Sequence, residues 1–306
     1  MKSFASITQL VGNTPLYELR SLQKETPGVR ILAKCEFFNP GGSVKDRAGL
    51  QMLKDAQPKA GQVVLDSTSG NTGIALAWIG AAMGLKVALV MPSNVSAARK
   101  RITKAYGAEL IFSDPLEGSD GAIRHARRLL EQEPGRYHYI DQYSNAGNPR
   151  AHYLTTAPEI WRQTDGQVTH FVAGIGTTGT VMGTGRRLKE LNPKVQVIAV
   201  EPLEALHGLE GLKHLPSSIV PPIYSAEVHD EKLSISTDSG WDMSDRLLRD
   251  EGLALGHSSG ANVAGAFEIA RRLVAKKEKG VIVTVFPDRA DRYFEPKRWE
   301  KTFPWP

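Results

Sequence analysis

The sequence predicts an α/β protein with two doubly wound domains and mainly parallel sheets. Short, continuous apolar stretches such as Val87–Met91 and Val281–Phe286 alternate with longer helical stretches. Strands that are apolar on both faces are typical of parallel sheets covered by helices on both sides. The alternation occurs in two runs, which predicts a smaller, mobile domain over residues 39–145 and a larger domain made of residues 1–38 and 146–306. In such folds a ligand binds in the cleft at the carboxyl ends of the strands.

Each element is predicted from its apolar pattern and from the residues that end it. Gly84 and Gly107 end two helices of the first run, because glycine readily adopts the left-handed conformation that closes a helix. Pro92 ends a strand, since proline cannot donate a hydrogen bond to a sheet. The expected strands are Ile31–Glu36, Val63–Asp66, Val87–Met91, Leu110–Phe112, Tyr137–Ile140, Val168–Ala173, Val195–Val200 and Val281–Phe286. The expected helices cover residues 47–56, 74–83, 96–106, 121–131, 180–191, 241–251 and 261–277, with another that ends over 159–164 and a loop-rich region over 202–226.

Composition and charge narrow the function classes. The 306 residues are 41% hydrophobic and 23% charged, which is ordinary for a globular protein. The net charge is +5, but the basic residues are scattered and are not interleaved with aromatic residues, so we expect no nucleic-acid partner. The chain starts without an apolar signal core and has no apolar window of about 18 residues, so we expect a cytoplasmic protein without membrane contact.

The cysteine and the histidines argue against a metal site. Cys35 is the only cysteine, which excludes an internal disulfide and a thiolate metal site. Its apolar neighbours Ile31–Ala33 predict that it is a small buried core residue. The histidines do not have the spacing of metal ligands, so we expect no metal.

The first candidate for chemistry is Lys45, in the stretch Asn39–Arg47. It follows a Pro-Gly-Gly turn at the expected start of a helix, with Ser43 as a candidate cap. A helix N-terminus disfavours a positive charge beside it, so Lys45 could attack an aldehyde and later act as a base. A solvated lysine in a salt-bridged turn explains this stretch equally well.

A second candidate is the glycine- and threonine-rich turn Gly174–Thr180, which follows an expected strand and opens a helix. Its glycines allow close approach of the backbone, and its N–H groups, hydroxyls and helix dipole would attract an anion. No Gly-Lys-Ser/Thr ends the turn, and the spacing of a dinucleotide site is also missing. The turn therefore predicts binding of a terminal phosphate monoester, with a plain glycine turn as the alternative.

Three further stretches are ambiguous. Thr68–Gly73 repeats the strand–turn–helix design and could hold a second anion such as a carboxylate, although a capped helix with Asn71 in a turn is equally consistent. Gly256–Gly260 is better explained locally by a serine that caps the next helix. Asp288–Tyr293 is more typical of a surface ion-pair cluster than of a site.

In combination, these motifs resemble the cysteine synthase family, which are pyridoxal-phosphate (PLP) enzymes of fold type II, the tryptophan synthase β-like fold. The resemblance runs along essentially the whole chain. It is carried by VGNTPL at 11–16, PGGSVKDR at 40–47, TSGNTGIALA at 68–77, DQYSNAGNP at 141–149, Thr155–Trp161, GIGTTGT at 174–180 and GHSSG at 256–260. The NPGGSVKDR, AHYLTTAPEIW and DRADRY segments and the short chain are more similar to the B-type than to the A-type enzymes.

The resemblance implies a role for each matched residue, and it replaces the local interpretation of the serine that precedes the last helix. Lys45 matches the catalytic lysine that bonds to the cofactor aldehyde and then removes the substrate Cα proton. The other implied cofactor contacts are Asn71 to the 3-hydroxyl oxygen, Gly176, Thr177, Thr178, Gly179 and Thr180 to the phosphate, and Ser258 to the pyridine nitrogen. The implied contacts to the substrate carboxylate are Thr68, Ser69, Gly70, Thr72 and Gln142.

The implied reaction is β-replacement of O-acetyl-L-serine by sulfide or thiosulfate through an α-aminoacrylate intermediate, giving L-cysteine or S-sulfocysteine. Such a transferase of cysteine biosynthesis would take a small amino acid and a sulfur donor, and the family suggests a homodimer. The smaller domain would close on the substrate carboxylate, and the larger domain would bind PLP.

Several alternatives stay open. Relatives that use O-phosphoserine place an arginine in the loop matched by Glu201–His207, where this chain has none, although Lys213 or His214 could substitute. A cystathionine β-synthase or a serine/threonine dehydratase of the same fold is the nearest rival. From another class, the chain could be an anion-binding module that lacks PLP.

Overall fold

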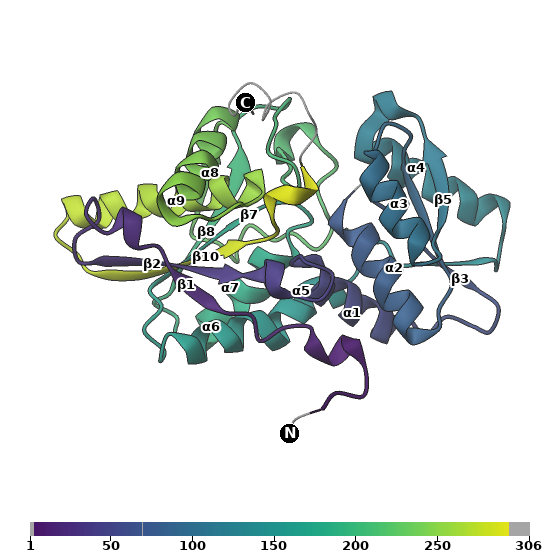
Figure 1. Ribbon diagram of the computed structural model, residues 1–306, viewed down its shortest axis with the longest axis horizontal. Coiled ribbons are helices and arrows are strands. Elements are labelled where there is room, and N and C mark those ends of the chain that lie inside the picture. Colours follow the sequence, from purple (N-terminus) through teal and green to yellow (C-terminus); the bar gives the residue numbers. More distant parts are fainter. Residues whose placement is uncertain (1–2, 69, 294–306) are drawn as a thin grey trace, which may run out of the picture.

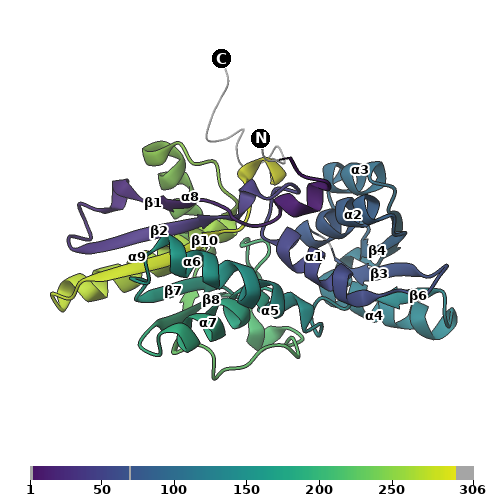
Figure 2. The ribbon, with the colours of Figure 1, turned by 90° about the horizontal axis from the view of Figure 1, so that it is seen from below.

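The computed structural model of the protein describes residues 3–68 and 70–293 and has two sheets, which lie in two neighbouring lobes (Figures 1 and 2). The larger sheet has the strand order β1-β2-β10-β7-β8-β9, and the smaller has the order β5-β4-β3-β6. Within the described chain, every neighbouring pair is parallel except β1 with β2. The predicted α/β fold with mainly parallel sheets is therefore confirmed.

The elements alternate along the chain as predicted. The strands are β1 (Leu16–Glu18), β2 (Val29–Cys35), β3 (Val63–Ser67), β4 (Val87–Pro92), β5 (Glu109–Ser113), β6 (Tyr137–Tyr139), β7 (His170–Gly174), β8 (Gln196–Pro202), β9 (Glu231–Ile235) and β10 (Gly280–Phe286). The helices are α1 (Lys45–Ala56), α2 (Asn71–Met83), α3 (Ala97–Ala105), α4 (Gly118–Gln132), α5 (Gly147–Ala151), α6 (Ala157–Gln163), α7 (Gly179–Leu191), α8 (Thr237–Glu251) and α9 (His257–Ala275). A π-helix, His152–Thr156, joins α5 to α6. Over residues 3–68 and 70–293, none of the helices has the length and apolarity to span a bilayer.

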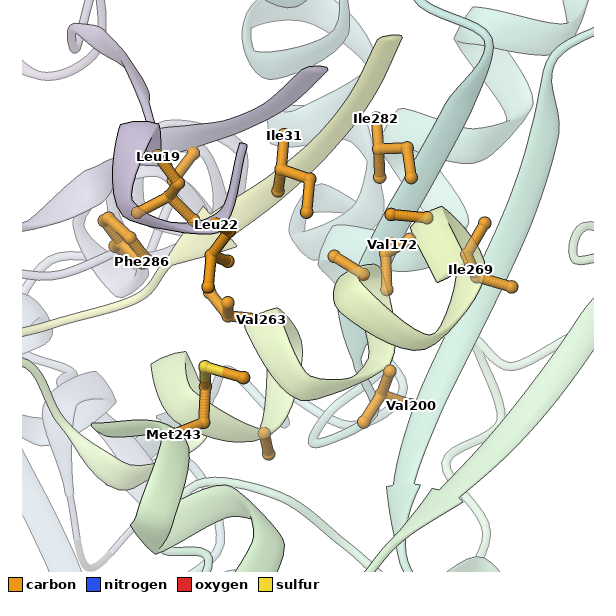
Figure 3. Close-up of a cluster of buried hydrophobic side chains, with 14 of the residues drawn as sticks. Leu19, Leu22, Ile31, Val172, Val200, Met243, Val263, Ile269, Ile282 and Phe286 are labelled. Atoms are coloured by element: carbon orange, nitrogen blue, oxygen red, sulfur yellow. The ribbon is translucent and has the colours of Figure 1, made fainter. Parts of the chain in front are cut away.

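The larger sheet is covered on both faces because its central strands bury apolar side chains on each side. Successive side chains point to opposite faces of a strand, so one strand contributes to two cores. The core on the α8 and α9 side contains Val172, Val200, Ile269 and Ile282 (Figure 3). The core on the α6 and α7 side contains Ile160, Phe171, Val181, Ala199 and Val283. Figure 1 shows α8 and α9 on one side of the sheet and α6 on the other.

Several helices begin earlier than the sequence indicates, and for α1 and α9 this changes the interpretation of a serine as a cap. Helix α1 begins at Lys45, with Val44 as its N-cap, so the predicted Ser43 cap is wrong. The Ser43 hydroxyl instead accepts a hydrogen bond from the Lys45 backbone N–H at 3.3 Å. Helix α9 begins at His257, which places Ser258 in its first turn.

The sequence reading also missed two edge strands, β1 and β9. The first is only three residues long, and the second, Glu231–Ile235, carries charged and polar residues. An edge strand pairs with one strand instead of two, and more of its surface is exposed to solvent. It therefore lacks the continuous apolar pattern of a central strand. The prediction for Cys35 is confirmed, since it is buried in the core between β2 and α9.

Candidate active site

A cavity of about 450 Å³, here called the main cavity, is lined by loops from both lobes. Thr68 and Thr72 follow β3, Gly176 follows β7, and Arg292 follows β10, so the cavity lies at the carboxyl ends of parallel strands. A smaller pocket of about 50 Å³, here called the inner pocket, shares Lys45 and other residues with it. This is the position predicted for a ligand in a doubly wound fold.

Four helices begin at these two spaces without a side-chain cap. Their N-caps are Val44 for α1, Gly70 for α2, Thr178 for α7 and Gly256 for α9. In contrast, Ser96 and Ser236 cap α3 and α8. Uncapped N–H groups and the positive ends of the helix dipoles attract anions. The converging helix starts therefore suit an anionic ligand.

Lys45 lines both the main cavity and the inner pocket. Its side chain keeps part of its surface open to the cavity, but desolvation lowers the pKa of its amine, an effect that the carboxylate of Asp288 opposes. An amine with a lowered pKa is more often neutral, so it can attack an aldehyde and accept a proton. Lys45 therefore lies in a cavity and not on the open surface, and its chemical role stays a prediction.

The turn Gly176–Thr180 forms a wall of the inner pocket. A side chain at Gly176 would collide with the backbone carbonyl of Gly211, so the close approach of these two segments requires glycine. Thr178 has a left-handed backbone with φ of 74°, and its buried hydroxyl has no hydrogen-bond partner among the described residues. An unpartnered hydroxyl beside an uncapped helix start fits an oxygen of a phosphate group.

Two buried side chains contact the hydroxyls of this turn. Asn148 Nδ2 donates to Thr177 Oγ1 at 2.9 Å, which leaves the hydroxyl proton of Thr177 for an acceptor in the pocket. His152 Nε2, in the π-helix, lies 3.3 Å from Thr180 Oγ1, and its Nδ1 lies 2.9 Å from Thr156 Oγ1. Burial lowers the pKa of His152 to about 3, so the ring is neutral at physiological pH.

A buried ion network anchors the helix that carries Lys45. Arg47 pairs with Glu36 and with Glu159, both at 2.7 Å, and Lys34 pairs with Glu159 at 2.7 Å. Burial alone would raise the pKa of Glu159, but hydrogen bonds and charge from Arg47 outweigh it and lower this pKa to about 2. The network fixes the first turn of α1 two residues from Lys45.

Ser258 is buried and lines the inner pocket together with Lys45, Asn71 and Thr178. It lies inside the first turn of α9, with Gly256 as the N-cap, so the interpretation of Ser258 as a cap is wrong. The structure thus brings together the residues that the resemblance assigns to the cofactor. Their arrangement fits a ligand with an aldehyde near the amine and a phosphate on the threonine turn.

Four of the residues expected to contact a substrate carboxylate line the main cavity: Thr68, Gly70, Thr72 and Gln142. Thr72 Oγ1 donates to Gln142 Oε1 at 2.7 Å, and Gln142 Nε2 donates to the Ser67 carbonyl at 2.9 Å. Thr72 and Gln142, which are far apart in the sequence, therefore form one unit beside the start of α2. Ser69 lies outside the described residues.

The prediction of a surface ion-pair cluster over Asp288–Tyr293 is largely wrong. Only Arg289 and Asp291 form such a pair, at 3.4 Å. Asp288 is completely buried, and Arg292 lines the main cavity. The segment follows β10 directly, and that position at the carboxyl edge of a parallel sheet was the signal that could have placed it in the site.

Two ion pairs connect the two lobes at the main cavity. Arg99 in α3 pairs with Glu210 at 2.7 Å, and Lys213 pairs with Asp120 in α4 at 3.1 Å. Three of these residues, Arg99, Glu210 and Lys213, line the cavity. Sequence reasoning missed Arg99, Glu210 and Asp120 because partners on separate elements form no local pattern.

Comparisons with known proteins agree with this geometry. The family model described as "Pyridoxal-phosphate dependent enzyme" matches residues 7–288. A cysteine synthase from Aquifex aeolicus (strain VF5) is 52% identical over 298 residues, which cover 95% of this chain and 91% of that protein. Cysteine synthase B from Pseudomonas aeruginosa is 44% identical over 294 residues, which cover 95% of this chain and 96% of that protein. The crystal structure of a cysteine synthase (OASS) from Entamoeba histolytica is similar with a TM-score of 0.90 and 38% identity, covering 96% of this chain and 90% of the other.

Proposed function

The chain belongs to the cysteine synthase family of PLP-dependent enzymes, and from this premise we propose that it replaces the acetoxy group of O-acetyl-L-serine with sulfide or thiosulfate. The products would be L-cysteine or S-sulfocysteine. The fold is the fold type II of these enzymes, and PLP is the cofactor.

The observation that carries the proposal is the composition of the inner pocket. The amine of Lys45, the unpartnered hydroxyl of Thr178 and the buried Ser258 come from three separate helix starts and line one space. A simple anion-binding module would need the threonine turn but not an amine whose pKa is lowered by burial. The combination supports an enzyme that binds a phosphorylated aldehyde.

We assign the phosphate of PLP to Gly176–Thr180, its ring oxygen to Asn71 and its pyridine nitrogen to Ser258. When bound, PLP supplies an electron sink for the electron pair that remains at the substrate Cα after proton removal. The hydroxyl of Ser258 carries no charge, so unlike a carboxylate it would not stabilise a protonated pyridine nitrogen. This environment favours loss of a leaving group from Cβ over transamination.

We assign the substrate carboxylate to Thr68, Ser69, Gly70, Thr72 and Gln142. The support is the uncapped start of α2 and the hydrogen bond between Thr72 and Gln142, which orients both polar groups at the wall of the main cavity. A carboxylate there would meet backbone N–H groups and the positive end of the α2 dipole.

Lys45 would then transfer the proton at the substrate Cα. Its lowered pKa favours the neutral amine that can accept this proton. The buried network around Arg47 holds the first turn of α1 and so limits the positions that the amine can reach. Because the amine is at the base of the cavity, closure over it would exclude water during the transfer.

We propose that residues 39–145 form the smaller domain that closes on the substrate, and that residues 1–38 and 146–306 form the PLP-binding domain. The contacts that would form this closed state are the two ion pairs between the lobes. Each is partly exposed and can open and close at small cost in free energy. Domain closure of this kind often limits turnover.

O-acetylserine is favoured over O-phosphoserine because the basic residues of the cavity already have partners. Arg99 is paired with Glu210, and Lys213 with Asp120. His214, the other candidate for a phosphate contact, hydrogen-bonds Ser217 and does not line the main cavity. O-phosphoserine is the second candidate substrate, because Lys213 does line the cavity and could exchange its partner for a phosphate.

A homodimer in the cytoplasm is also part of the proposal. The N-terminal region exposes large apolar side chains that a partner could cover, among them Phe4, Ile7 and Leu10. Light scattering of the purified protein tests the dimer, and a monomer at micromolar concentration would contradict it.

The decisive experiment measures product formation with each serine ester and each sulfur donor. The holoenzyme should convert O-acetylserine with sulfide or thiosulfate at least about tenfold faster than O-phosphoserine. Faster turnover of O-phosphoserine would overturn the substrate assignment. Release of ammonia and pyruvate from serine would identify a dehydratase. Cystathionine formation from homocysteine together with serine or a serine ester, without turnover of sulfide or thiosulfate, would identify a cystathionine synthase.

A further inference from the structure

We propose that Arg292 and Asp288 are positioning residues that fix the side-chain amide of Asn71, so that its NH₂ group faces the cofactor ring oxygen. This inference rests on the proposed contact between Asn71 and PLP. Both residues come from the turn after β10, whereas Asn71 begins α2 in the other lobe. The two lobes would thus build one hydrogen-bonding unit.

The three side chains form a chain of hydrogen bonds. Arg292 Nη1 donates to Asn71 Oδ1. Asn71 Nδ2 donates to Asp288 Oδ2 at 2.5 Å, and the Tyr293 hydroxyl donates to the same carboxylate oxygen. Asp288 is completely buried, and its other oxygen, Oδ1, has no hydrogen-bond partner among the described residues.

The chemistry of these partners permits only one orientation of the amide. A guanidinium group has donors and no acceptor, so it must face the amide oxygen of Asn71. The oxygen of Asp288 that already accepts from Tyr293 must face the amide NH₂. In a flipped amide, the NH₂ group would face the N–H donors of Arg292, and the amide oxygen would face the carboxylate oxygen of Asp288. Neither pair could form a hydrogen bond. One amide proton bonds Asp288, and the second is left for an acceptor in the pocket.

Arg292 also connects this unit to the lysine turn. Its Nη2 donates to the carbonyl oxygen of Gly41, four residues before Lys45. A side chain at Gly42, where φ is 76°, would approach the same nitrogen, so the turn needs glycine for both reasons. One guanidinium therefore contacts the segment that carries the amine and the residue assigned to the ring oxygen.

The competing explanation is that Arg292 only stabilises the fold by joining the two lobes. The two explanations differ in one respect. If Arg292 acts by positioning Asn71, replacing Arg292 should no longer change PLP affinity in a variant that already lacks Asn71. A structural role should have the same effect on PLP affinity with or without Asn71.

The experiment measures the dissociation constant of PLP by fluorescence titration of the apo forms of R292M, N71A and the double variant. We expect R292M and N71A each to weaken PLP binding roughly tenfold to 100-fold, as for loss of a hydrogen bond to a charged group. The double variant should bind no more than about threefold more weakly than N71A alone. R292K, which retains a donor, should recover part of the affinity.

Each other outcome has a defined meaning. Multiplied losses in the double variant would overturn the positioning role and leave the contact of Asn71 intact. Unchanged affinity in N71A would overturn both the contact and the inference. If R292M does not fold, D288L and D288N approach the same amide from the other side. D288N keeps an acceptor and should bind PLP within about threefold of the natural enzyme, and equal losses in D288N and D288L would count against the inference.

Discussion

The guanidinium of Arg47 donates a hydrogen bond of 2.9 Å to the hydroxyl of Thr155. This contact joins α1, the helix that begins at Lys45, to the π-helix His152–Thr156. His152 of the π-helix in turn contacts Thr180 in the threonine turn. A run of contacts through Arg47, Thr155 and His152 thus links the helix of the amine to the threonine turn, and Arg47 and His152 in this run are buried. In the proposed assignment, PLP would span the space between these two groups.

Replacing Lys45 with alanine should abolish the visible absorbance of the bound cofactor and lower turnover by at least about 10²-fold, because the group proposed to bind the aldehyde and to move the Cα proton is lost. Absorbance spectra after dialysis and initial rates give the two values. Lys54→Ala is the matched control, since Lys54 is exposed on the same helix. A surviving absorbance band would show that another residue holds the cofactor.

Replacing Thr72 with alanine should raise the KM for the amino-acid substrate while the cofactor content stays unchanged. Thr72 lines the main cavity, its hydroxyl donates to Gln142, and it does not line the inner pocket assigned to the cofactor. Loss of one such hydrogen bond corresponds to roughly a threefold to tenfold change. Steady-state kinetics gives the KM, and absorbance gives the PLP content. If the variant purifies without cofactor, the assignment of Thr72 to the substrate would be contradicted.

Replacing Arg47 with methionine should destabilise the enzyme by about 3–5 kcal/mol, because Glu36 would lose its ion-pair partner inside the protein and Glu159 would keep only Lys34. Urea unfolding of the apoenzyme measures the change. Arg150→Met removes an exposed ion pair with Asp55 and should cost less than about 1 kcal/mol. Equal effects in the two variants would mean that the buried network does not stabilise α1.

The pH dependence of stability should contain a contribution from His152. Its pKa in the folded protein is about 3, below the usual 6.5, so between these values the unfolded chain binds a proton that the folded protein does not. Stability from this source is full above pH 6.5 and falls as the pH is lowered. From pH 7 to pH 5, the natural enzyme should lose about 2 kcal/mol more than His152→Asn loses. Urea unfolding at the two pH values tests this, and identical losses would show a charged or exposed histidine.

Weakening the two ion pairs between the lobes should loosen the closed state. Glu210→Gln and Asp120→Asn should each raise the KM for the amino acid by up to about fivefold, since partly exposed pairs contribute roughly 0.2–1 kcal/mol. About 0.5 M NaCl should have a similar effect on the natural enzyme. Glu133→Gln, which breaks a pair with Arg136 inside one lobe, is the control. No difference from this control would mean that the pairs do not contribute to closure.

Much of the fold could be predicted because its central strands are apolar on both faces. Val87–Met91 and Val281–Phe286, for example, match β4 and β10 within one residue at each end. The helix starts could not be placed as well. Lys45 and Ser258 lie inside first turns that have no side-chain cap, so the rule that serine marks a helix start failed for Ser43 and Ser258.

In the candidate site, too, some residues could be predicted from their local sequence and others could not. The place of the threonine turn Gly176–Thr180 in the pocket could be predicted from its own residues, since glycine and threonine at a strand–helix junction have a direct physical reason to bind an anion. Asp288 and Arg292 were not, because charged residues near a chain end usually face solvent and only the topology of the sheet places them in the cavity. Their partner Asn71 is more than 200 residues away in the sequence.

The π-helix changes the directions in which the side chains of α5 and α6 point. Residues 147–163 form one continuous rod in which a wide turn takes up more residues than an α-turn does. Each residue added to a helix rotates the following side chains by about 100°. The side chains after His152–Thr156 are therefore rotated about the helix axis relative to the side chains before it. This rotation lets His152 contact the threonine turn while Thr155 and Glu159 contact Arg47.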